Sequence, residues 1–270
     1  MNELESIFCK LLNCDRSSLY LNSKRPALSI SQLNRLEKIL KKRTQGEPLQ
    51  YLIGDTDFMG ITLKVSPGVL IPRPETEILV EQALEWIKTE GRSLKVLDIG
   101  TGSGNIPIAL AKSLSAGLLD IYSVDISDEC LKIARSNAKN CGAANKITFL
   151  KSDIFSCFRG NDRFDCIISN PPYVCAEEYE NLARDCRHEP KSALLAQEGG
   201  LYFYRRIEDG AREYLSCGGA LFLEIGDTQA DGVRKIFKDT KIWQDVTFIE
   251  DFCNRDRVAV IKKVDSEQTL

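Results

Sequence analysis

From residue 94 onward the sequence repeats one pattern, in which an apolar strand is followed by a short turn and an amphipathic helix. Strands are predicted at residues 94–99, 121–124, 147–150, 164–169, 220–225, 246–250 and 258–262. Helices are predicted between most of them, including one over residues 201–215 that follows a long loop. Strands that alternate with helices form a parallel sheet with helices on both faces. The pattern therefore predicts a doubly wound α/β domain whose ligands bind beyond the carboxyl ends of the strands, where the strand order reverses.

The stretch ahead of these strands divides into two parts. Residues 1–48 are predicted to form a small helical N-terminal domain, with apolar side chains of the first helix on one face and Ser29 or Ser31 capping a second helix. Residues 49–70 are predicted to be an extended connector or hairpin. Residues 71–270 are expected to form the main domain, whose first helix starts at Pro74.

The charge balance and the cysteine pattern exclude several classes of protein. A formal net charge of -3 gives no sign of a broad polyanion-binding surface, so no direct nucleic-acid partner is expected. The 10 cysteines form no C-x-x-C pair and there is one histidine, so no metal site of the usual zinc spacing is expected. The acidic start lacks the features of a signal peptide, and no apolar run is long enough to span a membrane. We expect a protein of the reducing cytoplasm without membrane contact.

A glycine-rich turn joins the strand 94–99 to the next helix. Its residues are candidates for cofactor binding: Gly100, Thr101, Gly102, Ser103 and Gly104. Glycines let the backbone approach a ligand closely, and the helix that follows offers free amides. Such a loop alone is weak support, because dinucleotide-binding folds carry a similar one.

Acidic residues end the next two strands. Asp125 can accept hydrogen bonds from both hydroxyls of a ribose, although a strand-end residue of this type can also cap a helix. Asp153 can accept a hydrogen bond from the exocyclic amine of an adenine, and Ile154 can lie against the adenine face. In register with the glycine-rich turn, these residues predict a nucleoside site.

Asn170, Pro171, Pro172 and Tyr173 follow the fourth strand. Two successive prolines remove two backbone donors and hold the chain extended, so neighbouring carbonyls stay available as acceptors. Such a corner can hold a planar NH2 group, which needs two acceptors. The alternative is a proline-stiffened exit from a strand.

In this order, the glycine-rich turn, the two acids and Asn-Pro-Pro-Tyr resemble the class I methyltransferases that use S-adenosylmethionine. The resemblance implies a seven-stranded Rossmann-like sheet in residues 71–270, with Asn170 next to both cofactor and substrate. Asn-Pro-Pro-Tyr at this place is similar to enzymes that methylate planar nitrogens of adenine, guanine or glutamine.

Further segments resemble the peptide chain release factor glutamine methyltransferases. They are Leu70–Glu77, Arg187–Pro190 with Ala193 and Leu194, Gly199–Leu201, Tyr204–Ile207, Leu223–Gly226 and Asp256–Val258, and the resemblance covers residues 46–263. It implies transfer of a methyl group to the side-chain nitrogen (N5) of the glutamine in the Gly-Gly-Gln motif of class 1 release factors. The stretch ahead of Gly46 is shorter than the helical domain usual in this family, which contributes to docking of the protein substrate.

A mechanism follows for the side chains in these segments. The Asn170 side-chain oxygen and the Pro171 carbonyl are predicted to accept the two hydrogens of the glutamine NH2, which points its nitrogen at the methyl donor. Pro172 would fix the bend and Tyr173 would pack on the amide face. Arg73 and Glu75 line the glutamine entry in one interpretation and are helix-start charges in the other.

Three alternatives remain at this point. One is a nucleic-acid amino-methyltransferase that acts on adenine N6 or guanine N2, against which the acidic balance stands. Another is a glutamine methyltransferase of a ribosomal protein, whose family lacks the Arg73–Glu77 segment. The third is a cofactor-binding regulatory module, which an intact Asn-Pro-Pro-Tyr disfavours.

Overall fold

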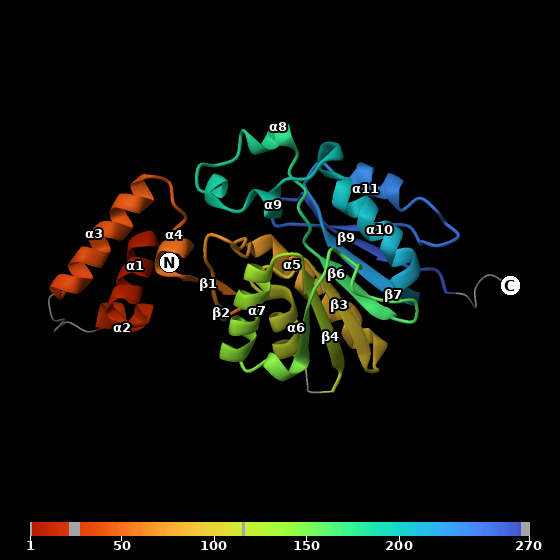
Figure 1. The fold of residues 1–270 in the computed structure, drawn as a ribbon, viewed down its shortest axis with the longest axis horizontal. Coiled ribbons are helices and arrows are strands. Elements are labelled where there is room, and N and C mark those ends of the chain that lie inside the picture. The colour runs from red at the N-terminus through yellow and green to blue at the C-terminus, as the bar shows by residue number, and fades with distance from the viewer. Residues whose placement is uncertain (1, 22–27, 115–116, 266–270) are drawn as a thin grey trace.

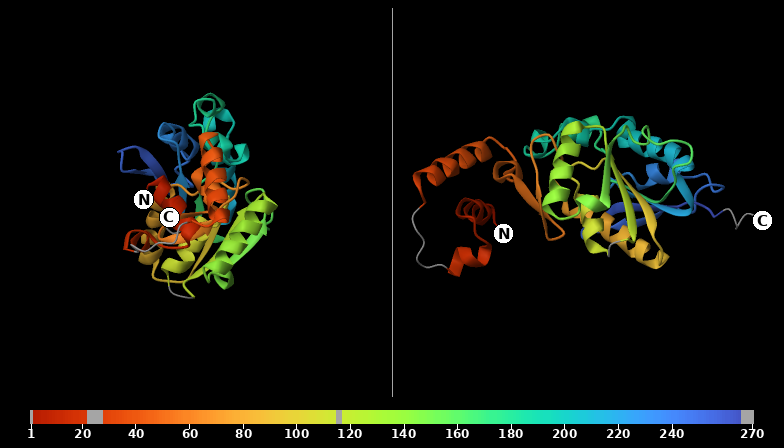
Figure 2. Two further views of the ribbon diagram at one scale, coloured as in Figure 1. Left: turned by 90° about the vertical axis from the view of Figure 1, so that its left-hand side faces the viewer. Right: turned by 60° about the horizontal axis from the view of Figure 1, so that its bottom comes forward.

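The chain folds into a seven-stranded sheet with helices on both faces and a group of helices beside it (Figure 1). The computed structural model describes residues 2–21, 28–114 and 117–265. In Figure 1 and in the right-hand view of Figure 2, the N-terminal helices lie beyond a small hairpin, to one side of the sheet. No helix within these ranges is both long and apolar enough to cross a membrane.

The N-terminal part contains α1 (Glu3–Leu12), α2 (Arg16–Leu21), α3 (Ile30–Thr44) and α4 (Leu49–Ile53). Ser29 caps α3 and accepts a hydrogen bond from the Gln32 amide, as the sequence indicated. The expectation of extended chain from residue 49 is wrong over α4. This helix is a single short turn between Pro48 and Gly54, too short to show a helical period.

The hairpin β1 (Asp55–Phe58) and β2 (Ile61–Lys64) follows, joined by two residues with positive φ, Met59 and Gly60. Positive φ at both turn residues is typical of the type I′ turn that matches strand twist. The Asn137 side chain pins this hairpin to the main domain, because it hydrogen-bonds both the Lys64 amide and the Lys64 carbonyl at 2.9 Å.

The remaining elements build the main sheet and its cover. The helices are α5 (Pro74–Glu90), α6 (Asn105–Ser113), α7 (Asp128–Asn140), α8 (Ala176–Tyr179), α9 (Lys191–Leu194), α10 (Tyr202–Tyr214) and α11 (Ala230–Ile236). The strands are β3 (Leu94–Ile99), β4 (Leu119–Asp125), β5 (Ile147–Lys151), β6 (Phe164–Ser169), β7 (Leu215–Glu224), β8 (Thr247–Glu250) and β9 (Asp256–Lys262).

The strand order is β5-β4-β3-β6-β7-β9-β8. The first five strands in this order are parallel, whereas β9 is antiparallel to both β7 and β8. The parallel sheet expected from the repeating pattern therefore has an antiparallel strand at this edge. The connection between β8 and β9 is too short for a crossover, so these strands must pair as a hairpin. The sheet is the seven-stranded Rossmann-like arrangement expected from the resemblance.

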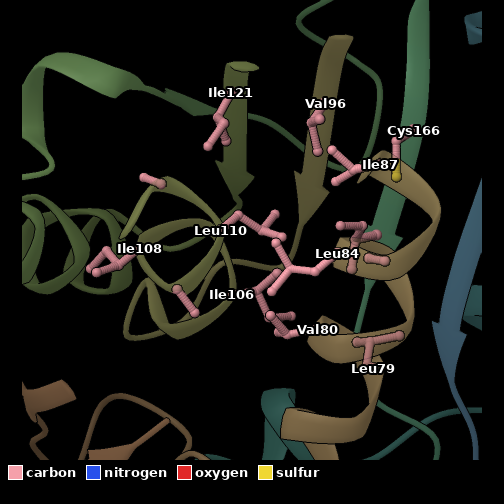
Figure 3. Packing of buried hydrophobic residues seen from close by; sticks show 14 of the residues in the cluster. Leu79, Val80, Leu84, Ile87, Val96, Ile106, Ile108, Leu110, Ile121 and Cys166 are labelled. Carbon is pink, nitrogen blue, oxygen red and sulfur yellow. The ribbon is translucent and has the colours of Figure 1, made fainter. Parts of the chain in front are cut away.

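Buried apolar side chains fill both faces of the sheet. On one face α5 and α6 pack against β3 and β4, as Figure 3 shows for Leu84, Leu110 and Val96. The other face is covered by α10 and α11, with Tyr204 and Trp243 among its fully buried side chains. The strand order reverses between β3 and β6, so the glycine-rich turn and Asn170 leave the sheet side by side at a well-packed edge.

Candidate active site at the carboxyl edge of the sheet

A cavity of about 170 Å³ opens where β3, β4, β5 and β6 end. Eight residues that the sequence singled out line it: Gly100, Gly102, Asp125, Asp153, Ile154, Asn170, Pro171 and Pro172. Apolar side chains that were not among the candidate site residues complete the walls, among them Leu70, Phe203 and Ile207. Phe203 and Ile207 come from α10, far along the chain; Ile207 ends the Tyr204–Ile207 segment of the resemblance, whereas Phe203 lies in no segment that the sequence pointed to.

The glycine-rich turn brings backbone rather than side chains to the cavity. Gly100 has a φ of 78°, which an L side chain rarely adopts, and its amide donates to the Val124 carbonyl at 2.9 Å. Gly104 starts α6 with a φ of 82°, and a Cβ there would lie 3.1 Å from that of Ala134. Close packing of α6 on α7 therefore fixes the turn.

Thr101, Ser103 and Gly104 do not line the cavity, in contrast to Gly100 and Gly102 of the same turn. Thr101 and Ser103 have a supporting role. Both are buried and brace the turn from behind. The Ser123 Oγ lies 2.6 Å from Thr101 Oγ1 and 2.7 Å from Asp98 Oδ2, and the Asn137 side chain donates to the Ser103 carbonyl at 2.9 Å. Burial raises the pKa of Asp98 to about 7, and the nearby Asp125 charge adds to this effect.

Asp125 is held by backbone amides on both of its oxygens. Its Oδ2 accepts from the Gly102 amide and its Oδ1 from the Ser127 amide, each at 2.9 Å. Burial raises the pKa of Asp125, and the amide hydrogen bonds act in the opposite direction. The carboxylate is thus fixed at the cavity wall while lone pairs remain for hydroxyl donors.

Asp153 and Ile154 form the part of the wall after β5. Both Asp153 oxygens face the Arg206 guanidinium at 3.0 Å, a partner that the sequence did not suggest because it lies in α10. Ile154 is buried and has a φ of 53°, which is exceptional for a β-branched residue. The Ser152 hydroxyl donates to the Ile154 carbonyl at 2.8 Å and holds this conformation.

Asn170 and Tyr173 converge on one buried carboxylate. The Asn170 Nδ2 donates to Thr76 Oγ1 at 3.0 Å, and Thr76 Oγ1 donates to Glu224 Oε2 at 2.6 Å. The Tyr173 hydroxyl donates to Glu224 Oε1 at 3.4 Å, and Tyr173 does not line the cavity. Burial raises the pKa of Glu224 to about 7. The sequence pointed to Glu224 only as part of the Leu223–Gly226 segment of the resemblance.

Arg73 and Glu75 lie outside the cavity wall. The Arg73 guanidinium pairs with Glu189, whose side chain is 1% exposed. Glu189 also accepts from the Ile71 amide at 3.0 Å. This carboxylate therefore clamps the segment before α5 to the loop that carries Pro190, a cavity residue. Glu75 is half-buried, and its charge contributes to the raised pKa of Glu224.

The cavity is chemically suited to a nucleoside with a polar tail. It combines fixed acceptors at Asp125 with apolar walls that include Ile154 and Phe203, and Asn170 and the two prolines also line it. A glycine-rich turn beside a carboxylate at the end of the next strand is the arrangement that binds a ribose in related parallel folds.

Comparisons with known proteins point in one direction. Residues 90–247 match a family model described as a methyltransferase domain, and residues 1–54 match the PrmC N-terminal domain. The release factor glutamine methyltransferase of Thermodesulfovibrio yellowstonii is 38% identical over 97% of this chain and 92% of its own length. That of Lactococcus lactis subsp. lactis is 39% identical over 96% of this chain and 93% of its own length.

Among solved structures, the chain is similar to the Thermus thermophilus 16S rRNA N2 G1207 methyltransferase in complex with AdoMet and guanosine. The TM-score is 0.55 with 19% identity, over 77% of this chain and 49% of that one. At this identity the similarity concerns the fold.

Proposed function

The chain belongs to the release factor glutamine methyltransferase family, and we propose that its cavity binds S-adenosylmethionine while Asn170 and Pro171 present the substrate glutamine. Its activity is the methylation of a release factor glutamine, and it is a methyltransferase. The observation that carries the site proposal is the meeting of Asp125 and Asn170 in one cavity.

The residues of the cavity fit this cofactor part by part. Asp125 would accept from the ribose hydroxyls, and Ile154 would lie against the adenine. Asp153 would reach the exocyclic amine only if it shared its carboxylate with Arg206. Gly100 and Gly102 would leave room for the amino-acid tail beside the turn. When bound, S-adenosylmethionine supplies a methyl group already activated by its sulfonium.

The protein contributes position and hydrogen-bond acceptors to the transfer. An amide nitrogen is a poor nucleophile, because its lone pair is delocalised into the carbonyl. Asn170 Oδ1 and the Pro171 carbonyl would accept the two NH2 hydrogens, hold the nitrogen toward the methyl group and stabilise the charge that develops on it. Pro172 keeps the chain extended at this corner, and Tyr173 fixes it through its hydroxyl.

The partner we propose is a class 1 peptide chain release factor in the cytoplasm. Its Gly-Gly-Gln motif would enter the cavity and bring the glutamine to Asn170. Residues 1–48 would serve as a docking domain, residues 49–70 as a connector and residues 71–270 as the transfer domain. A second cavity of about 260 Å³, lined by Arg35, Lys38 and Tyr51, offers a basic face on the helical part for an acidic surface of the partner.

The test is incubation with labelled cofactor and either release factor or nucleic acid, followed by mass analysis of the Gly-Gly-Gln peptide. Asn170→Ala is expected to lower kcat by about 10²–10³-fold, with cofactor affinity retained, because one acceptor of the NH2 is lost. Asn181→Ala is the matched control, since Asn181 is an exposed asparagine in the loop that follows. Label in nucleic acid alone, or near-normal turnover by Asn170→Ala, would contradict the proposal.

A further inference from the structure

Three side chains from separate elements form a chain of hydrogen bonds behind the cavity. Asn170 follows β6, Thr76 lies in the first turn of α5, and Glu224 is the last residue of β7. Asn170 is 3.0 Å from Thr76, and Thr76 is 2.6 Å from Glu224. Thr76 and Glu224 are both 1% exposed, so water does not compete for these contacts.

Counting hydrogens decides the direction of this chain. A threonine hydroxyl has one hydrogen, and an ionised carboxylate can only accept. Next to ionised Glu224, the Thr76 hydrogen must therefore point at the carboxylate. Only lone pairs of the Thr76 oxygen then face Asn170, so the Asn170 group beside it must be the NH2. The Asn170 oxygen is left for the cavity that this residue lines.

The direction matters because the two ends of an asparagine amide have opposite hydrogen-bonding roles. An oxygen turned to the cavity accepts from the NH2 of a substrate amide, whereas an NH2 group there would meet another NH2 group. We propose that ionised Glu224, acting through the Thr76 hydroxyl, holds the Asn170 amide with its oxygen toward the substrate. Thr76 and Glu224 are thus positioning residues, an assignment that rests on the proposed function.

The charge state of Glu224 controls this arrangement. The groups that face it are Thr76 and Glu75 of α5, Tyr173 after β6, Arg257 of β9 and Tyr204 of α10. Burial and Glu75 raise the pKa of Glu224 to about 7, while the hydrogen bonds from Thr76 and Tyr173 and the charge of Arg257 act in the opposite direction. A protonated Glu224 can donate to Thr76, which frees the Thr76 hydrogen and removes the constraint on Asn170.

The experiment compares variants of one helix in the full-length protein. Thr76→Val keeps the shape and removes the hydroxyl, and it is expected to lower kcat by about 10–100-fold with unchanged cofactor affinity. Thr76→Ser restores the hydroxyl and is expected to stay within about threefold of the wild type. Thr89→Val, at an exposed threonine near the end of α5, controls for the substitution itself and should leave kcat unchanged.

The pH profile separates positioning from a structural role. The kcat of the wild type is expected to fall as pH drops below about 7, the pKa of Glu224. In Glu224→Gln this acid limb disappears, because the group no longer titrates. A Thr76→Val enzyme with wild-type kcat, or an acid limb that persists in Glu224→Gln, would overturn the proposal.

A second measurement needs no substrate, so its failure is distinct from failure of the proposed function. The exchange of the Asn170 side-chain NH2 with water, measured by NMR and divided by its intrinsic rate at the same pH, should be slow at about pH 8 and closer to the intrinsic rate at about pH 6, where Glu224 is protonated. The slow exchange should be absent in Thr76→Val. Equal exchange relative to the intrinsic rate at both pH values, or in both proteins, would overturn the role of Thr76 and Glu224 even if release factor is methylated normally.

Discussion

Helices α1 to α4 bury Ile7, Leu11 and Ile39 in their own small cluster, whereas the main sheet carries a far larger cluster on each face. The helical part also leaves large apolar side chains such as Leu33 and Leu40 exposed. Short helices gain little stability alone and depend on packing. Every residue that lines the 170 Å³ cavity comes from residues 68 to 207, within or next to the sheet. Chemistry that needs fixed distances is therefore built on the well-packed region.

The largest expected effect comes from replacing one buried leucine by alanine in each of the two regions. Leu97→Ala, at a fully buried position of β3, should lower the free energy of unfolding by about 2–5 kcal/mol and weaken cofactor binding. Leu11→Ala should loosen the helical cluster alone, leaving cofactor binding and methylation of a short glutamine peptide intact. Denaturant unfolding with calorimetric cofactor titration measures both. One shared transition with equal losses would show that the two regions are a single cooperative unit.

A smaller difference is expected between one ion pair in each region. Arg73→Met leaves the Glu189 carboxylate buried without its cation and should cost about 1–3 kcal/mol, below the range for fully buried pairs because Arg73 is 31% exposed. Lys10→Met breaks the pair with Asp55, where both side chains are partly exposed, and should cost less than about 1 kcal/mol. Unfolding midpoints of the two variants provide the comparison, and equal losses would contradict it.

The smallest effect concerns how the free energy of unfolding changes with pH, which should have opposite signs for one carboxyl group in each region. Asp98 has a pKa raised from 3.8 to about 7 by burial, so folding favours its protonated form. Its stabilising contribution is present at low pH and is lost as pH rises from about 4 to about 7. The pKa of Glu3 is lowered by Arg43, so its contribution is lost as pH falls.

Asp98→Asn should therefore flatten the fall in stability between about pH 5 and 7, whereas Glu3→Gln should flatten the loss at lower pH. Unfolding curves recorded across pH for the two variants measure this. A slope unchanged by Asp98→Asn would show that Asp98 is ionised throughout this range.

Local signals predicted most of the fold. Pro74 marks the start of α5, Ser127 caps α7, and the uninterrupted apolar run of β3 ends where expected. The glycine-rich turn and Asn170 could be placed at one sheet edge, because parallel strands bring their carboxyl ends together. Class and topology follow from such short-range rules.

What the sequence could not supply are pairings between distant residues. Thr76 and Glu224 are 148 positions apart, and Asp153 and Arg206 are 53 apart, so no period or spacing relates them. The pairing of Arg73 with Glu189 was not predicted for the same reason, since the two residues lie 116 positions apart. A short connection predicts that β8 pairs with β9, but it does not predict which of the two strands lies next to β7. The structure places β9 there.

The left-handed Ile154 has a consequence for how such an enzyme can change. A β-branched residue in this conformation costs of order 1–3 kcal/mol, which the Ser152 hydrogen bond and the surrounding packing must offset. Glycine at position 154 would relieve that cost but remove an apolar wall of the cavity. Adaptation to heat and retention of a tight cofactor slot therefore favour different residues at this one position.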